Sequence, residues 1–99
     1  MNDFCKIMGR LRELYDTDPY NLPNNFWYTI DELPNDIVFV WIERLLKIDC
    51  LLLGKDYLRV VDIQHQYRLY KSYTQKQKRS IMIDLIKHWY DVEFRYELV

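Results

Sequence analysis

The strongest constraint on the fold is the spacing of apolar residues in the last quarter of this 99-residue chain. Side chains recur there at intervals of three and four residues: Ile81, Met82, Leu85, Ile86, Trp89, Val92 and Tyr96. This spacing is typical of one face of an α-helix. Thr74 and Gln77 have the spacing of a capping box, which marks where a helix begins. We therefore predict an amphipathic helix over Gln75–Phe94.

Two earlier segments carry similar helical patterns. Apolar residues recur at helical spacing over Asp3–Tyr15, where Asp3 can cap the first turn. This helix is expected to end before Pro19, because the residue that precedes a proline avoids helical backbone angles. A second helix is predicted over Asn35–Ile48, and its unbroken apolar run Ile37–Ile42 indicates the most buried helix of the fold. The β-branched and aromatic residues of that run also allow a strand.

The segment Asp18–Asp31 is predicted to connect these two helices, because it is rich in proline and asparagine. It contains three adjacent aromatic residues, Phe26, Trp27 and Tyr28, which need burial. We expect them to pack over the core as a hydrophobic lid. The alternative is an exposed surface that binds a partner, since Trp and Tyr are enriched at the energetic centres of protein interfaces.

Residues 51–70 have the pattern of β-structure. Two apolar runs, Leu51–Leu53 and Tyr57–Val61, flank the glycine-containing loop 54–56, which is typical of a β-hairpin. Apolar and polar residues then alternate as far as Tyr70, and this alternation predicts a long strand. The alternative is a helix, whose apolar face would contain Val60, Ile63, Tyr67 and Tyr70.

Together these patterns predict a single domain, residues 1–99, of the α+β class. Two or three helices would pack with a β-hairpin or a long strand pair, and one of them would be the C-terminal amphipathic helix. An all-α bundle is the alternative fold. A chain of this length buries roughly two-thirds of its unfolded surface, which allows a modest apolar core.

The charges of the chain are unevenly distributed, although the formal net charge is only −1. Between Glu13 and Glu43 all the charged residues are acidic, whereas between Ile63 and Ile83 all of them are basic. If the two segments lie on opposite faces, the molecule is dipolar and can present a basic face to an anionic partner. If they lie side by side, they neutralise each other.

A basic and aromatic tract runs from Tyr67 to Arg79. It interleaves cations with tyrosines, as contact with a phosphate backbone and stackable bases would require. An ordinary solvated helix start beside a tyrosine-rich strand has the same composition. Three of the cations fall in the first turns of the predicted helix, where they oppose the helix dipole, as expected if an anion binds there. The candidate nucleic-acid contacts are Arg68, Tyr70, Lys71, Tyr73, Lys76, Lys78 and Arg79.

The sequence carries no catalytic or metal signature, so we expect a non-enzymatic protein without metal or cofactor. Cys5 and Cys50 are far apart and are expected to be reduced and buried, because each falls within an apolar segment. They do not form a close pair of the kind that zinc sites use. His65 falls on the apolar side of the predicted strand, which favours a core histidine. His88 and Asp91 have the spacing of a general-base pair, but surface pairs of this kind on helices are far more common.

The chain is predicted to be intracellular, because it shows neither a signal peptide nor an apolar run that could span a bilayer. It contains no alanine and only two glycines, but nine tyrosines. This composition fits an AT-rich genome and resembles that of small proteins of bacteriophages and archaeal viruses. The resemblance implies a viral or mobile-element origin, with the host cytoplasm as the location.

The residues Leu33-Pro34-Asn35-Asp36-Ile37-Val38, followed by Trp41, Ile42 and Leu45, resemble the opening of an F-box. Residues 57–67 resemble its second half more loosely, after an insertion around residues 53–55. This resemblance implies a helical module that binds an adaptor of ubiquitin ligases through apolar residues. The same leucine-proline pattern is also a common way to begin a helix.

Two functions follow from these features. The first is a small nucleic-acid-binding protein, with the cations of the tract on phosphates and its tyrosines on bases. The alternative is a protein–protein interaction module, either a homodimer or an inhibitor or adaptor of a host protein. That module would use Phe26, Trp27 and Tyr28 as its binding surface.

Overall fold

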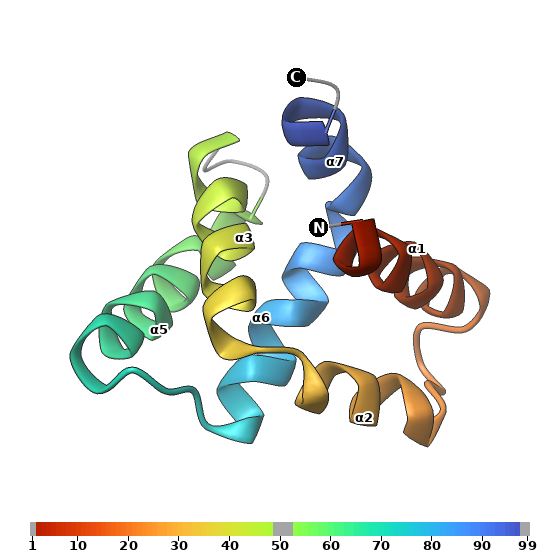
Figure 1. Ribbon diagram of the computed structural model, residues 1–99, viewed down its shortest axis with the longest axis horizontal. Coiled ribbons are helices and arrows are strands. Elements are labelled where there is room, and N and C mark those ends of the chain that lie inside the picture. Colours follow the sequence, from red (N-terminus) through yellow and green to blue (C-terminus); the bar gives the residue numbers. More distant parts are fainter. Residues whose placement is uncertain (1, 49–52, 98–99) are drawn as a thin grey trace.

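The computed structural model describes residues 2–48 and 53–97 (Figure 1). Within these ranges the chain is helical and contains no β-strand. In chain order the elements are α1 (Asn2–Thr17), α2 (Asn24–Glu32), α3 (Asn35–Ile48), the 3-10 turn η1 (Gly54–Asp56), α5 (Tyr57–Tyr70), α6 (Gln75–Lys87) and α7 (Trp89–Glu97). The prediction of an α+β fold is therefore wrong, and the alternative, an all-α bundle, is the observed fold.

The predicted hairpin and the long strand up to Tyr70 are replaced by η1 and α5. Gly54 adopts a left-handed backbone (φ 56°) and opens η1, which leads directly into α5. The first strand of that hairpin, Leu51–Leu53, falls mostly outside the described residues. A helix forms here because helical spacing brings Val60 and Gln64, one turn apart, to the same fully buried face.

The helix α2 occupies much of the segment 18–31, which the sequence predicted as a connection. It begins directly after Pro23, whose backbone is extended. Phe26 and Ile30 lie four residues apart and are fully buried, so one face of α2 packs on the core. The prediction was wrong because the prolines and asparagines of this segment indicate turns, whereas the helical spacing of Phe26 and Ile30 is a weaker signal.

The helices predicted near the N-terminus and in the middle of the chain are confirmed as α1 and α3. The run Ile37–Ile42, for which a strand was the alternative, is helical throughout. Helix α3 buries one residue in each turn and two at its centre, namely Val38, Trp41, Ile42 and Leu45. It therefore contributes a continuous apolar face to the core. The prediction that it is the most buried helix is wrong, because α6 buries more of its residues and Val40 of the run is exposed.

The C-terminal helix begins where the sequence predicted but breaks once. The capping box forms, since the Gln77 N–H donates to Thr74 Oγ1 and the Thr74 N–H donates to Gln77 Oε1, both at 3.0 Å. At His88 the backbone leaves helical angles (φ −109°, ψ 18°), and the chain continues as α7. The predicted helix Gln75–Phe94 is therefore two helices, and the second packs on α1 and α3.

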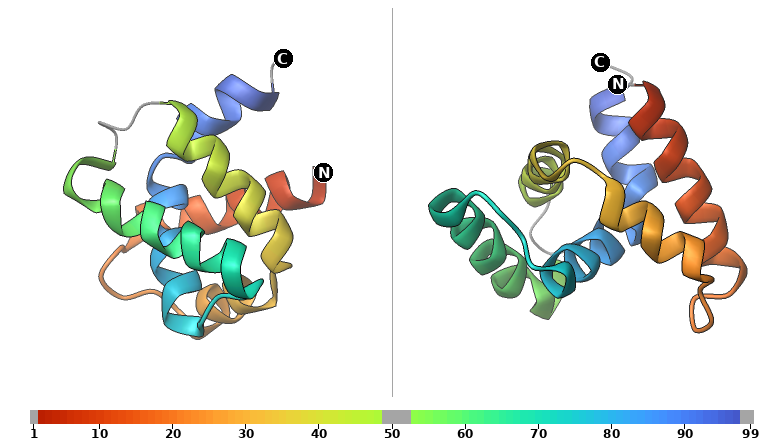
Figure 2. Two further views of the ribbon diagram at one scale, coloured as in Figure 1. Left: turned by 90° about the vertical axis from the view of Figure 1, so that its left-hand side faces the viewer. Right: turned by 60° about the horizontal axis from the view of Figure 1, so that its bottom comes forward.

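Helix α6 lies at the centre of the fold, with α1, α2 and α3 packed against it (Figures 1 and 2). The left view of Figure 2 shows α3 and α5 side by side in front of α6. The central position of α6 follows from its apolar face, which is fully buried and consists of Ile81, Met82, Leu85 and Ile86.

An aromatic cluster joins both ends of the chain to its middle. Phe4 of α1 stacks on Trp41 of α3, with 5.4 Å between the ring centroids. Trp89 of α7 contacts Phe4 at 6.0 Å and Trp41 at 5.1 Å. All three rings are buried, so the cluster forms the part of the core that holds α1, α3 and α7 together.

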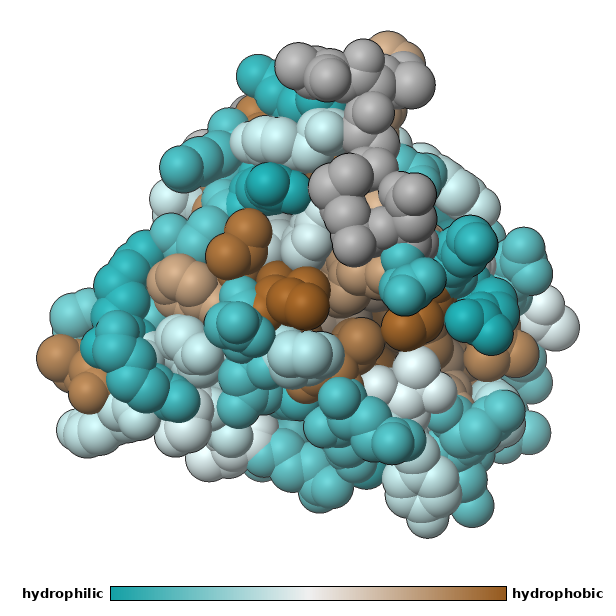
Figure 3. Space-filling view, in the orientation of Figure 1, coloured by the Kyte–Doolittle hydropathy of each residue, from teal (hydrophilic) through white to brown (hydrophobic). Residues whose placement is uncertain are grey.

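The surface is mixed in polarity. On the face drawn in Figure 3, apolar side chains form small separate patches among polar ones. Among the described residues, no helix combines the length and the apolar character that crossing a membrane requires.

Candidate functional site

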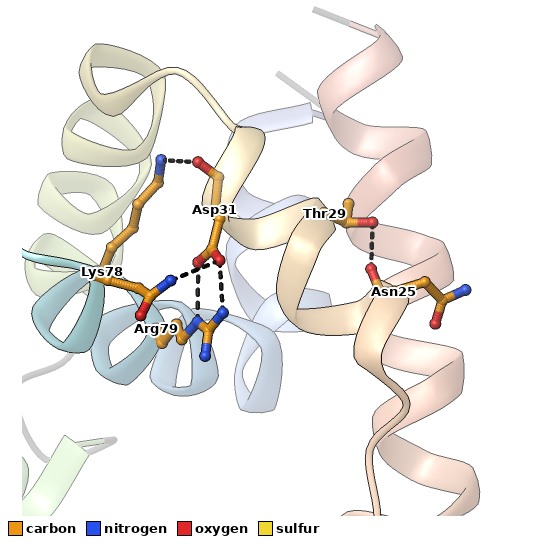
Figure 4. A network of polar contacts seen from close by, with 6 residues as sticks. Asn25, Thr29, Asp31, Lys78 and Arg79 are labelled. Atoms are coloured by element: carbon orange, nitrogen blue, oxygen red, sulfur yellow. Dashed lines mark hydrogen bonds and ion pairs between the residues drawn. The ribbon is translucent and has the colours of Figure 1, made fainter.

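The acidic and basic segments of the chain lie side by side, and Asp31 and Arg79 join them. Asp31 lies in the last turn of α2, and Arg79 lies in the second turn of α6. The Arg79 Nε and Nη2 donate to the two carboxylate oxygens of Asp31 at 2.9 and 2.6 Å (Figure 4). Gln75 adds a third hydrogen bond to this carboxylate at 3.1 Å. The two segments therefore neutralise each other at this point, which is one of the two arrangements that the sequence allowed.

Lys78, a predicted phosphate contact, is buried instead of exposed. Its ammonium donates to the backbone carbonyls of Asp31, at 3.0 Å, and of Leu33 (Figure 4 shows the first of these). These carbonyls lie at the carboxyl end of α2, where a helix leaves its acceptors unpaired. Burial lowers the pKa of Lys78, and the nearby charge of Asp31 opposes this effect. Lys78 therefore fastens the end of α2 to α6.

Arg68 and Tyr73 also have partners within the chain. Arg68 forms an ion pair with Glu43. The Tyr73 hydroxyl donates to Oε1 of the buried Gln64 at 2.5 Å, and burial raises the pKa of Tyr73. The Tyr73 ring stacks on Tyr67 with 4.5 Å between centroids, so the face that was predicted to stack on bases is covered.

Four of the predicted nucleic-acid contacts are exposed: Arg68, which is paired with Glu43, and Tyr70, Lys71 and Lys76. Lys71 follows the last turn of α5 in a left-handed backbone conformation (φ 56°). Lys76 is the second residue of α6. Within the described part of the chain, neither lysine has an ion-pair partner. The basic tract therefore has two cations available to an outside anion, not five.

The aromatic trio is divided between core and surface. Phe26 is fully buried, as expected of a lid, whereas Tyr28 is 59% exposed. Trp27 is partly buried, meets the ring of Phe26 edge-on at 5.0 Å and lies under the guanidinium of Arg79 at 5.4 Å. Trp27 and Tyr28 thus fit the alternative reading, a surface that a partner can contact.

A groove of about 290 Å³ lies between α2 and α6. We call it the Trp27 groove, and its lining residues are Trp27, Gln75, Lys76, Arg79, Ser80 and Ile83. Its walls combine an aromatic ring, an aliphatic side chain and two cations. The groove thus brings together members of both predicted sites, the aromatic trio and the basic tract.

The sequence did not identify Gln75, Ser80 and Ile83 as members of this site, nor the role of Asp31. A signal for Ile83 was present, because residues 76, 79 and 83 are spaced by three and four and so share one face of a helix. No comparable signal identified Asp31, because its partner Arg79 is 48 positions away in the chain.

A larger groove of about 540 Å³ lies between the starts of α1 and α3 and is lined by Asp3, Phe4, Asp36, Ile37, Val40, Trp41 and Arg44. Its two carboxylates lie in the first turns of their helices, where a negative charge interacts favourably with the positive end of the helix dipole. Helix stability therefore explains them. Lys76 of the Trp27 groove lies at the same end of a helix with the opposite charge, so helix stability does not explain its position.

The described residues form no candidate metal site. No group of three or more potential metal ligands lies close together among them. His65 is exposed on α5, so its predicted place on the apolar side of a strand is wrong. His88 is partly buried at the helix break, and Asp91 is exposed. Cys5 is partly buried on α1, whereas Cys50 lies outside the described residues.

One buried carboxylate, Asp84, could have indicated acid–base chemistry. Burial raises its pKa, and a hydrogen bond from Arg59 opposes this effect. Arg59 Nη2 lies 2.7 Å from Asp84 Oδ2, and Arg59 also donates to Ser80. Because a guanidinium stays protonated, it cannot relay a proton from the serine to the carboxylate. We interpret this group as a structural ion pair between α5 and α6.

No protein-family model matches this chain, and the comparisons with curated proteins and with solved structures also found no match. Among the apolar residues behind the F-box resemblance, Pro34 is exposed and Ile37 is partly buried, whereas the others are buried: Leu33, Val38, Trp41, Ile42 and Leu45. These buried side chains therefore stabilise this fold and are not exposed to an adaptor.

The ion pair of Asp31 should give stability a measurable pH dependence. Hydrogen bonds from Arg79 hold the pKa of Asp31 below its ordinary value of 3.8, although burial opposes them. The ionised carboxylate thus stabilises the folded state above that value, and this stabilisation is lost as the pH falls through the folded pKa. In thermal unfolding from about pH 5 to about pH 2, Asp31→Asn should lose less stability than the wild type.

The matched control is Arg79→Gln, which removes the other half of the pair. It should flatten the pH dependence in the same way, and the double variant should add little further change because the two groups act together. An unchanged acid limb in both single variants would show that the pair does not contribute to stability.

Proposed function

We propose that this protein is a non-catalytic interaction module that binds another protein at the Trp27 groove. The observation that supports this most directly is a partly exposed tryptophan on the wall of a groove, next to the exposed Tyr28. Trp and Tyr are the residues most often found at the energetic centres of protein interfaces. Only Phe26 of this trio is fully buried, and with Ile30 it forms the core face of α2, so Trp27 and Tyr28 are not required in the core.

The alternative, a nucleic-acid-binding protein, is the second candidate. Tyr70 and Lys71, adjacent and exposed at the end of α5, favour it. It is the weaker proposal because Arg68, Lys78 and Arg79 have partners within the chain. Salt dependence separates it from protein binding, because each phosphate contact contributes about −0.9 to the slope of log affinity against log salt for duplex DNA.

The test of the proposed function is Trp27→Ala, with Tyr20→Ala as the matched control. Tyr20 is 97% exposed and lies outside the groove. A partner captured by the wild-type protein should also be captured by Tyr20→Ala. Once the partner is purified, Trp27→Ala should weaken its binding by roughly tenfold or more in titration calorimetry. Equal affinity of Trp27→Ala and the wild type would contradict the proposal.

Tryptophan fluorescence gives an independent readout, because Trp41 and Trp89 are buried. A change in emission on partner binding would therefore come mainly from Trp27. Sedimentation at several concentrations identifies the case in which the partner is a second copy. In that case the wild type would associate, and Trp27→Ala would remain monomeric.

A further inference from the structure

We infer that the Trp27 groove binds an acidic and apolar segment of its partner, with an apolar side chain against Trp27 and Ile83 and a neighbouring carboxylate on Lys76. This inference rests on the proposed function and specifies the chemistry of the partner. Three features of the groove support this inference: the charge that the fold leaves unpaired, the residues that line the groove, and its size.

Three cations lie in the first turns of α6, and they differ in how far they are neutralised within the described residues. Lys78 is buried and donates to the backbone at the end of α2, and Arg79 forms its ion pair with Asp31. Lys76 is exposed and, among the described residues, has no such partner. It also lies at the positive end of the helix dipole, where a cation is unfavourable until an anion approaches. A carboxylate of a partner would neutralise it.

The lining of the groove determines what else the partner must carry. Trp27 contributes an aromatic ring and Ile83 an aliphatic side chain, so an apolar group gains by leaving water there. Pockets for small molecules usually enclose about 300 to 1,000 Å³. The Trp27 groove, at about 290 Å³, falls just below that range and fits a protein side chain.

The same charges exclude other occupants. A basic segment would bring its cations toward Lys76, whose charge is not neutralised within the described residues, and like charges held together at an interface cost binding energy. A nucleic acid would need further cations along its backbone, and Lys78 is not available for that role. Among segments that carry an apolar anchor, an acidic one is therefore favoured.

The experiment is a selection from a phage-displayed library of random peptides on the intact wild-type protein. Selected peptides are synthesised, and their affinities are measured by fluorescence polarisation against four variants: Trp27→Ala, Lys76→Glu, Lys76→Gln and Lys71→Glu. The last is the matched control, because Lys71 is an exposed lysine of the same tract outside the groove. Thermal unfolding confirms that each variant is folded.

We expect the selected peptides to combine Asp or Glu with Leu, Phe or Trp. Their affinity should fall roughly tenfold for Lys76→Glu, less for Lys76→Gln, and stay unchanged for Lys71→Glu. Because a glutamate is favourable at this end of a helix, Lys76→Glu should be at least as stable as the wild type. The loss of binding would then not be attributable to unfolding.

The other outcomes separate the two proposals. Peptides that need Trp27 but are rich in Lys or Arg, or that bind Lys76→Glu as well as the wild type, would overturn the inference and leave the proposed function standing. A selection that yields no peptide sensitive to Trp27→Ala would overturn both.

Discussion

Replacing Trp89 with alanine is expected to destabilise the protein by about 3–5 kcal/mol. Trp89 is fully buried and is the contact through which α7 reaches the rings of Phe4 and Trp41. The substitution leaves a cavity between three helices that come from both ends and the middle of the chain. Because domains are stable by only about 5–15 kcal/mol, this loss is a large share of the total.

Urea unfolding followed by circular dichroism measures the effect, with Phe94→Ala as the control. Phe94 lies on the same helix but is 71% exposed, so its removal should change stability by no more than about 0.5 kcal/mol. Similar stabilities for the two variants would show that the aromatic cluster does not hold α7 on the bundle.

Lys78→Met is expected to cost about 2–3 kcal/mol. Methionine retains much of the apolar stem but removes the ammonium that donates to the carbonyls of Asp31 and Leu33. Those acceptors, at the carboxyl end of α2, would then be buried without a donor, and hydrogen bonds to a charged group are among the stronger ones.

The control for Lys78→Met is Lys76→Met, two positions away on α6. Lys76 is exposed, so this change should stay within about 0.5 kcal/mol of the wild type in the same urea experiment. The comparison also separates two roles of these lysines. If Lys78 were an exposed phosphate contact, substituting it would leave stability unchanged. If its ammonium is buried and donates to the end of α2, the substitution lowers stability.

This result bears on how the basic tract is tested. Substituting Lys76, Lys78 and Arg79 together would remove the fastening of α2 and its ion pair along with the surface charge. A weaker affinity in that triple variant would not distinguish lost contacts from a displaced helix. Single substitutions at Lys76 and Lys71 change only exposed cations and avoid this ambiguity.

The parts of the fold that could be predicted from the sequence are those fixed by local interactions. The start of α6 is one example, because Thr74 and Gln77 cap each other within a single turn. The helix α1 is another, since its apolar residues recur at regular helical spacing. The break at His88 has no such local signature: the residues on either side continue the same spacing, and contacts of α7 with α1 and α3 accompany the change of direction.

The sequence predicted helix α5 only as the alternative to a strand, because the segment is weakly amphipathic. Leu58 and Leu69 are largely exposed, while the polar Gln64 is fully buried. These three positions break the helical pattern, and Gln64 and Leu69 also fit the alternating one. Gln64 is tolerated inside because its side chain donates to Glu43 and to the carbonyl of Phe39 and accepts from Tyr73. Such partners come from other helices and are not visible in one segment.

The kinds of residue that form the candidate site could be predicted from the sequence. Which individual residues are available for binding could not. Exposed aromatics and a basic tract indicated binding, but only the fold pairs Asp31 with Arg79 and buries Lys78. Pairing across this distance in sequence depends on how α2 packs on α6. As a result, the cations of one basic tract differ in the folded protein: Lys78 is buried, Arg79 is paired with Asp31, and Lys76 is available to a partner.

The short length of α2 has a consequence for the motions of the protein. Helices of fewer than about 12–15 residues are marginal on their own in water, so α2, with nine residues, depends on its contacts with α6. It is held by two buried apolar side chains, Phe26 and Ile30, by the polar contacts of Asp31 with α6, and by Trp27 under the guanidinium of Arg79. Segments held by few contacts open well below the free energy of global unfolding. The Trp27 groove would then exist only while α2 is packed on α6. Any ligand that contacts both helices would therefore slow amide hydrogen exchange in α2.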